Sequence, residues 1–309
     1  MALGNHSTMM ESILLGLSSD PHTQALLFVL FLLVYLLTLT GNMTMRWVIR
    51  ADSHLHTPMY YFLSHLSFLD LCFSSVTVPK MLENLLSKRK TISVESCLAQ
   101  AFFVFITAGT EALYSVMAYG RCVAICQPLL YGQEMSEQRY ALLVWGSWSL
   151  GILNTLISAP LATKMGSCDT HIIPHYSCEL PSLFLLSCSD ASTNLIAMLW
   201  SLSPHGVVTS LSIFFSCACI VSTILSITST SGRSKAFSMC SSRLTTVILF
   251  SGSGFLHYFT PMSGSSLELV FSVLYSIVIP MLNPLIYSLR NKEVKAALHR
   301  TLGKYLQCF

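Results

Sequence analysis

Residues 26–45 read LLFVLFLLVYLLTLTGNMTM, a stretch without a single charged side chain. A helix of ~20 apolar residues is long enough to cross the hydrocarbon core of a bilayer. Further stretches of this kind follow along the chain. We therefore predict an all-α membrane protein, a seven-transmembrane helix bundle forming one domain over residues 1–309, with spans at about 26–49, 58–80, 98–121, 140–161, 194–227, 236–259 and 269–290.

The composition supports this fold class and excludes others. The chain has 309 residues, of which 53% are hydrophobic and only 10% are charged, whereas soluble domains carry about 25% charged residues. The net charge of +3 is too small to indicate a nucleic-acid partner. The sequence shows no paired carboxylates, no nucleophile beside a base, no phosphate-binding loop and no Cys/His spacing that fits a metal. We expect no enzyme, no cofactor and no metal.

The basic residues predict the orientation in the bilayer. Arg46 and Arg50 directly follow the first span, and Lys and Arg are enriched on the cytoplasmic side of membrane proteins. Residues 1–25 are then extracellular, and after seven spans residues 291–309 form a cytoplasmic tail. We expect a multi-pass protein of the plasma membrane.

Two features of the chain ends follow from this topology. Asn5, in the triplet Asn-His-Ser, becomes an accessible glycosylation site. In the tail, Val294, Leu298 and Leu302 recur at helical spacing between basic residues. This pattern predicts a short amphipathic helix that lies on the inner leaflet.

Four cysteines fall on the predicted outer side of the membrane: Cys97, Cys168, Cys178 and Cys188. That side is oxidising, which favours disulfides. Four cysteines allow three pairings, and the residues alone leave the pairing open.

Polar side chains lie within the predicted spans at Asn42, Asp70, Glu111 and Asn283. Ionisable groups inside a bilayer are costly and usually face the interior of the bundle. Two interpretations remain open: a hydrated network that rearranges between two states, or fixed polar contacts between helices. Pro284 removes one backbone hydrogen bond beside Asn283, so it predicts either a hinge or a static bend in the last span.

Four segments carry a recognisable pattern, in this order: LHTPMYYFLS (55–64), MAYGRCVAIC (117–126), KAFSMCSS (235–242) and PMLNPLIYSLRN (280–291). Together they resemble the vertebrate olfactory, or odorant, receptors within the rhodopsin-like G-protein-coupled receptors. The resemblance runs from Asn5 to about Lys295. It implies that the protein binds a small volatile odorant, activates a heterotrimeric stimulatory G protein of the olfactory type and raises cAMP.

The resemblance also implies site residues. It implies a ligand pocket in the outer half of the bundle, with the candidates Phe105, Ala108, Gly109, His205, Gly254, Tyr258 and Ser276. Most of these are small or apolar, which suits a weakly polar ligand, although simple helix packing is the alternative for each. The implied switch residues at the inner side are Arg121, Asn283, Pro284 and Tyr287. The implied disulfides are Cys97–Cys178 and Cys168–Cys188.

The chain departs from the family pattern around the switch arginine. The family has an acidic residue before this arginine and an aromatic residue after it, where this chain has Gly120 and Cys122. Two further aromatic positions of the family hold small residues here: Cys217 and Ser251. The interval of ten positions from Glu111 to Arg121 is one shorter than usual, and one missing residue turns a helix by about 100°. A folded but poorly coupled relative is therefore the main alternative. A transporter is disfavoured because few charged groups could line a central path.

Overall fold

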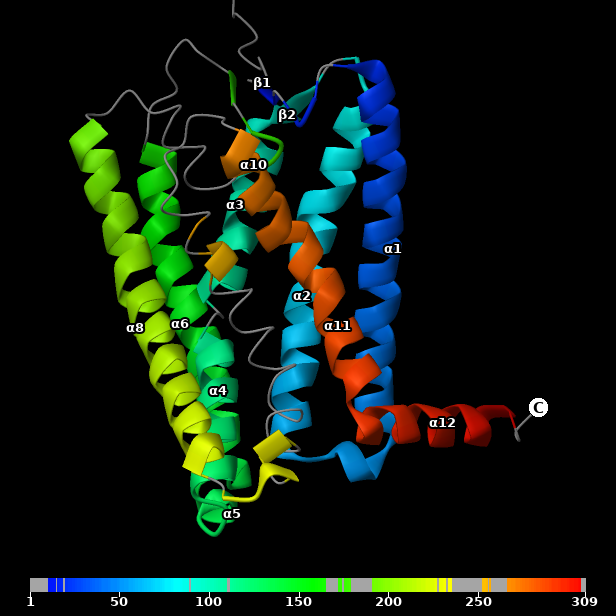
Figure 1. Ribbon diagram of the computed structural model, residues 1–309. Helices are drawn as coiled ribbons and strands as arrows, with labels where there is room; N and C mark the ends of the chain where they lie inside the picture. Colours follow the sequence, from blue (N-terminus) through cyan, green and yellow to red (C-terminus); the bar gives the residue numbers. More distant parts are fainter. Residues whose placement is uncertain are drawn as a thin grey trace, which may run out of the picture.

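The computed structural model shows a bundle of long helices with a short helix across one end (Figure 1). It describes residues 11–14, 16–18, 20–88, 90–109, 112–164, 172–173, 175–178, 191–226, 228–231, 233–234, 252–254, 256 and 266–306. The main helices are α1 (Pro21–Ala51), α2 (Pro58–Leu86), α3 (Val94–Gly109), α4 (Ala112–Cys126), α6 (Glu137–Lys164), α8 (Ala191–Ser226), α10 (Ser266–Val273), α11 (Ile279–Arg290) and α12 (Lys292–Leu306). The shorter elements are η1 (Ser53–Leu55), α5 (Tyr131–Glu134), η2 (Leu274–Val278), β1 (Glu11–Leu14), β2 (Thr91–Ser93) and β3 (Ile172–Ile173).

Within these described residues, four helical segments are long and apolar enough to cross a bilayer: Pro21–Ala51, Pro58–Leu86, Thr209–Ser226 and Leu267–Tyr287. They overlap the predicted first, second, fifth and seventh spans. The predicted third span overlaps α3 and α4, and the predicted fourth span overlaps α6. The predicted sixth span, 236–259, lies outside the described residues except for 252–254 and 256. The number of seven spans therefore stays a prediction.

α1 shows why such residues form a membrane helix. Asp20 caps its start by accepting hydrogen bonds from the backbone nitrogen and the hydroxyl of Thr23, at 2.9 and 2.6 Å. Pro21 occupies the first turn, where no backbone donor is needed. Leu26 and Leu33 have exposed fractions of 72% and 55%. A helix in water would bury side chains of this kind, so the exposed apolar face indicates contact with lipid.

The helices pack in two groups that share one core. α1 packs along α2 and α11, while α3 packs along α6 and α4 along α8 (Figure 1). One buried apolar cluster contains side chains from α1, α2, α4, α6, α8, α11 and α12. Leu113 of α4 and Val144 of α6 are fully buried in it. This cluster joins the two groups near the end of the bundle that carries α12, which we call the α12 end.

A three-stranded sheet covers the opposite end, which we call the sheet end. The strand order is β2-β1-β3, with β1 antiparallel to β2 and parallel to β3. Leu14, Ile92 and Ile173 are buried beside the disulfide between Cys97 and Cys178, whose Cα atoms lie 5.3 Å apart. The all-α prediction omitted this sheet, because strands of two to four residues are too short for a periodic pattern.

α12 runs across the ends of α1 and α11 (Figure 1). Val294, Ala297 and Thr301 form its buried face, and Leu298 is half-buried. The structure thus has a helix where the sequence predicts a short amphipathic one. The prediction placed Leu302 on the apolar face, but this side chain is exposed because the buried face follows 294, 297 and 301.

Asp52, between α1 and η1, ties α12 to the bundle. Its carboxylate accepts hydrogen bonds from Nε and Nη2 of Arg300 at 2.9 and 2.6 Å, and from the backbone nitrogen of His54 at 3.0 Å. Burial opposes ionisation of this carboxyl, but the hydrogen bonds from Arg300 and His54 outweigh it and lower the pKa of Asp52 to about 2.

Candidate functional site

The polar side chains predicted inside the spans include a hydrogen-bonded group that joins three helices. Asn283 of α11 donates from its amide nitrogen to a carboxylate oxygen of Asp70 in α2, at 2.8 Å. The same nitrogen donates to the hydroxyl of Tyr114 in α4, at 3.1 Å. An amide carries two N–H donors, so both bonds form together. All three side chains are buried, and each of the three helices contributes one member of this hydrogen-bonded group.

Asn42 of α1 contacts α11 about one turn before Asn283. Its amide nitrogen donates to the backbone carbonyl of Pro280, at 3.0 Å. In an unbroken helix that carbonyl would accept from residue 284, but Pro284 has no backbone N–H. Asn42 therefore supplies the donor that Pro284 lacks. Gly41 makes the approach possible, because a Cβ atom there would lie 2.9 Å from Cγ of Pro284.

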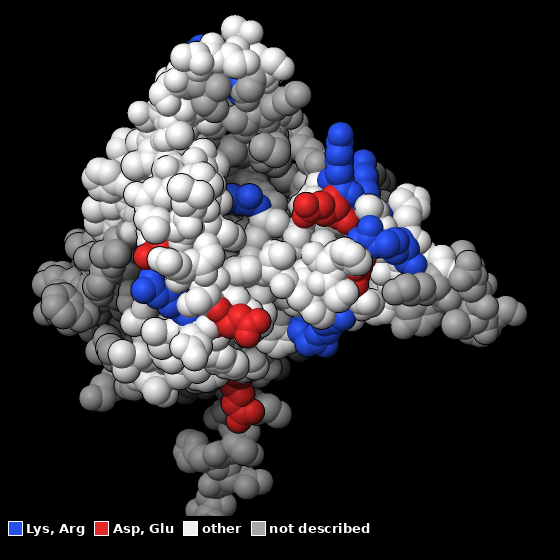
Figure 2. Space-filling view, turned by 90° about the horizontal axis from the view of Figure 1, so that it is seen from below, with Lys and Arg blue, Asp and Glu red and all other residues white. Residues whose placement is uncertain are grey.

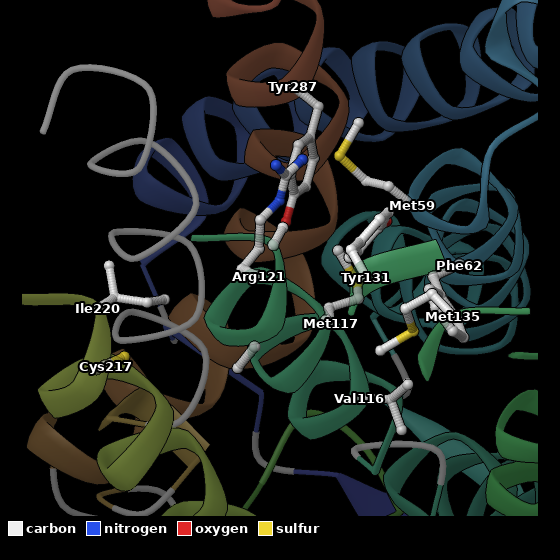
Figure 3. Close-up of a pocket in the computed structure, with 13 residues that line it drawn as sticks. Met59, Phe62, Val116, Met117, Arg121, Tyr131, Met135, Cys217, Ile220 and Tyr287 are labelled. Atoms are coloured by element: carbon white, nitrogen blue, oxygen red, sulfur yellow. The ribbon is translucent and has the colours of Figure 1, made fainter. Parts of the chain in front are cut away.

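A pocket opens at the α12 end, and thirteen described residues line it. Arg121 of α4 is the only charged one among these thirteen, and the wall is mostly apolar. Figure 3 shows the side chains of Arg121 and Tyr287 extending into the same space from α4 and α11. Figure 2, which shows the molecule from this end, has a hollow in its middle with a basic side chain inside it. The sequence-predicted switch residues Arg121 and Tyr287 therefore come together, and Asn283 and Pro284 lie one turn further into the bundle.

The residues that depart from the family pattern have defined neighbours. A Cβ atom on Gly120 would lie 3.2 Å from Cε of Met135, the flexible end of a side chain. Cys122 packs against Ile220 and Ile224 of α8. A side chain at position 120 therefore requires a small shift of Met135, and position 122 is in contact with α8.

Towards the sheet end, Ser276 lies on the π-helical turn η2. Its hydroxyl lies 2.6 Å from the hydroxyl of Tyr176 and donates to the backbone carbonyl of Ser272, at 2.7 Å. Tyr176 also lies 2.7 Å from the hydroxyl of Ser272. Gly254 is buried, and a Cβ atom there would lie 3.2 Å from the ring of Tyr275. Gly254 thus packs against the residue of η2 that directly precedes Ser276.

Comparison with known proteins decides the family. The sequence profile named "Olfactory receptor" matches residues 31–305. The chain belongs to the olfactory receptor family. Olfactory receptor 8S1 of Homo sapiens is 66% identical over 296 residues, which cover 96% of this chain and 82% of that protein. Olfactory receptor 8A1 of Homo sapiens is 48% identical over 305 residues, which cover 98% of this chain and 93% of that protein. Olfactory receptor 5G9 of Mus musculus is 47% identical over 307 residues, covering 98% of each.

Olfactory receptors are G-protein-coupled receptors of sensory transduction and not enzymes. The apolar helices of this chain agree with a multi-pass membrane protein of that family. The family resemblance predicted from the four sequence segments is confirmed.

Other predicted site residues of this olfactory receptor are placed only in part. α3 contains Phe105, Ala108 and Gly109, and α8 contains His205, but only the backbone of these four is described. The remaining predicted sites lie outside the described residues: Asn5, Glu111, Cys168, Cys188 and Tyr258. Glycosylation, the second disulfide and the shortened third span therefore stay predictions.

Sequence reasoning missed Tyr114 and Tyr176. Tyr114 precedes Met117 and Arg121 by three and seven positions, which puts it on the same face of a helix as the switch arginine. That spacing is the signal that could have found it. Tyr176 lies between the cysteines of a loop, where no periodicity indicates the direction of a side chain.

Proposed function

We propose that this olfactory receptor binds small volatile, mostly apolar odorants and activates a stimulatory G protein that raises cAMP. The match of residues 31–305 to the family carries the proposal. The bundle supplies the two ends that such a receptor needs: a disulfide-tied cap at one end and a pocket with Arg121 at the other.

The proposed topology is a seven-transmembrane bundle in the plasma membrane with an extracellular N-terminus. The Cys97–Cys178 disulfide at the sheet end supports an outer, oxidising location for that end. Arg46 and Arg50 near the α12 end support a cytosolic location for the other end. In this topology α12 lies along the inner leaflet.

The proposed odorant pocket lies in the outer half of the bundle, with Phe105, Ala108, Gly109, His205, Gly254, Tyr258 and Ser276 as its candidate residues. The contact of Gly254 with Tyr275, which precedes Ser276 on η2, supports this location. A ligand that prefers one arrangement of these helices shifts the population of receptors towards it.

The proposed G-protein site is the pocket at the α12 end. Its wall is apolar, with Arg121 and Tyr287 as polar groups that reach into it. Such a wall suits an apolar helical segment of a partner, and a single basic side chain suits its backbone carbonyls or carboxylate. Asn283 and Pro284 then transmit movement of α11 to this pocket.

A poorly coupled receptor is the second candidate function. The observation that favours it is Gly120 beside Arg121, where the family places an acid, together with Cys122 and Cys217. An acid before the arginine normally restrains it, so its absence alters the balance between resting and active states.

The test is cAMP in cells that carry this chain, with surface labelling of the N-terminus and a broad odorant panel. A dose-dependent rise that Arg121→Ala abolishes at equal surface level supports the working receptor. Surface expression without a response supports the poorly coupled receptor. In that case Gly120→Asp with one residue restored in the third span should gain odorant-driven signal, and no gain at equal surface level would refute poor coupling as the cause.

A further inference from the structure

A second cavity of about 690 Å³ opens near the α12 end, between α1, α2 and α6. It is separate from the pocket that contains Arg121, since the two share no lining residue. Phe68 and Trp145 line it and are exposed, with exposed fractions of 38% and 60%. The cavity therefore joins a polar interior to an apolar outer surface that faces lipid in the proposed topology.

Two hydrogen-bond donors in this cavity have no partner. Nε of Arg46 and Nε1 of Trp148 are both buried without an acceptor. The guanidinium group of Arg46 lies over the ring of Phe68, with Cζ 4.6 Å from the ring centroid. This contact holds the charge in place but gives the Nε–H no acceptor. Buried donors without acceptors are costly, most of all at membrane depth.

The charge of the cavity favours an anion. Arg46 and Arg50 line it, and Glu137 is the only carboxylate among its described lining residues. None of the ion pairs found among the described residues involves Arg46, Arg50 or Glu137. The cavity is therefore a basic site with unmet donors, at the depth of a bilayer surface.

We propose that this cavity binds the phosphate group of an anionic phospholipid of the inner leaflet. A phosphate accepts from the guanidinium of Arg46 and from the indole of Trp148, and its charge matches the two arginines. The acyl chains of the lipid lie along Phe68 and Trp145. A free phosphate has no apolar part that could make these contacts. The proposal uses only the proposed membrane orientation and is independent of odorant binding and of coupling to a G protein.

The experiment measures the lipids retained by the purified full-length receptor in native mass spectrometry, after reconstitution with phosphatidylcholine alone or mixed with phosphatidylserine. Wild type should retain one phosphatidylserine in preference to phosphatidylcholine. Arg46→Gln should weaken this retention about tenfold, since hydrogen bonds to charged groups are strong. Trp148→Phe keeps an aromatic ring, removes the donor and should weaken retention about threefold.

Arg139→Gln is the matched control, because Arg139 lies on α6 at the same end but pairs with Glu134 outside the cavity. Its retention of phosphatidylserine should equal that of wild type. Equal losses in Arg139→Gln and Arg46→Gln would overturn the proposal in favour of unspecific attraction. Undiminished retention in both Arg46→Gln and Trp148→Phe would also overturn it. Two further samples, with cholesterol or with soluble glycerophosphate added to the mixture, test other occupants: preferential retention of cholesterol, or displacement of phosphatidylserine by glycerophosphate, would overturn the proposal. A receptor silent in the cAMP assay that retains phosphatidylserine through Arg46 leaves the lipid site established and rejects only the signalling function.

Discussion

The amide nitrogen of Asn283 lies 2.8 Å from a carboxylate oxygen of Asp70, although 213 positions separate the two residues in the chain. With the second bond to Tyr114, this one side chain connects α2, α4 and α11. α4 also carries Arg121, and α11 also carries Tyr287. The bond between Tyr114 and Asn283 thus couples the two helices whose side chains meet in the α12-end pocket.

The contact between Tyr114 and Asn283 is expected to appear as a coupling energy. Tyr114→Phe removes the hydroxyl and should lower the free energy of unfolding by about 0.5–1.5 kcal/mol. In the Asn283→Ala background the same change should cost clearly less, because its partner is already missing. Thermal unfolding of the purified receptor in detergent measures both. Ser147→Ala, which removes a buried hydroxyl that bonds only within its own helix, should show no such coupling, and equal costs of Tyr114→Phe in both backgrounds would contradict the contact.

Gly41→Ala is expected to destabilise the receptor. The added methyl group would lie 2.9 Å from Cγ of Pro284, a rigid ring, so α1 and α11 must separate. Gly146→Ala on α6 is the matched control because a Cβ atom there meets nothing within 4 Å. Alanine in place of glycine in a helix interior gains about 0.5–1 kcal/mol, so the control should raise the unfolding temperature. A rise in both variants would refute the close approach of Gly41 to Pro284.

Tyr176→Phe is expected to loosen the sheet end. Its hydroxyl contacts the hydroxyls of Ser272 and Ser276 and is buried. Its loss should lower the free energy of unfolding by about 1–3 kcal/mol, since both serines lose a partner in a buried place. Tyr35→Phe removes a hydroxyl that makes one long contact of 3.3 Å with Ser75 at the surface, so its effect should be much smaller. Equal shifts in unfolding temperature for the two variants would show that the buried contacts contribute nothing.

The attachment of α12 is expected to depend on pH. The pKa of Asp52, about 2, lies below its ordinary value of 3.8 because of Arg300 and His54. The contribution of this carboxylate is therefore complete above about pH 4 and is lost as the pH falls towards 2. Hydrogen exchange of the α12 amides in detergent, stepped from pH 5 to pH 2.5 and corrected for the intrinsic rate, should show the loss of protection.

Asp52→Asn should show that loss already at pH 6. The control is Lys295→Gln, which removes a basic charge from an exposed position of α12 and should leave protection unchanged. If Asp52→Asn and wild type have the same exchange at pH 6, the contact with Arg300 does not hold α12.

The sequence predicted most of the helices, because an uncharged apolar run of the length of 26–45 is typical of a membrane-spanning helix. It also predicted Asp70 as inward-facing, since an ionisable group in a bilayer is costly unless it faces the interior of the bundle, and it placed Asn283 at a similar depth. It did not predict that these two would bond to each other. Helical spacing gives the face of a residue on its own helix and leaves open which helix packs against that face.

The sequence patterns predicted neither the three-stranded sheet nor the π-helical turn η2. β1, β2 and β3 depend on pairing among segments 11–14, 91–93 and 172–173, and no local pattern records a partner so distant. Ser276 was predicted from family position as a ligand contact. In the structure its hydroxyl contacts the hydroxyl of Tyr176 and donates to the backbone carbonyl of Ser272. These contacts result from the packing at the sheet end.

The bond from Asn42 to the carbonyl of Pro280 has a consequence for biosynthesis. The two residues are 238 positions apart, so the ribosome releases Pro280 long after Asn42 has entered the membrane. Until the last span docks on α1, the carbonyl opposite Pro284 faces hydrocarbon without a donor. The hydrogen bonding of α11 is therefore completed only when α1 packs against it. For a chaperone or quality-control factor that senses exposed polar backbone, the carbonyl of Pro280 distinguishes an unassembled chain from a completed one.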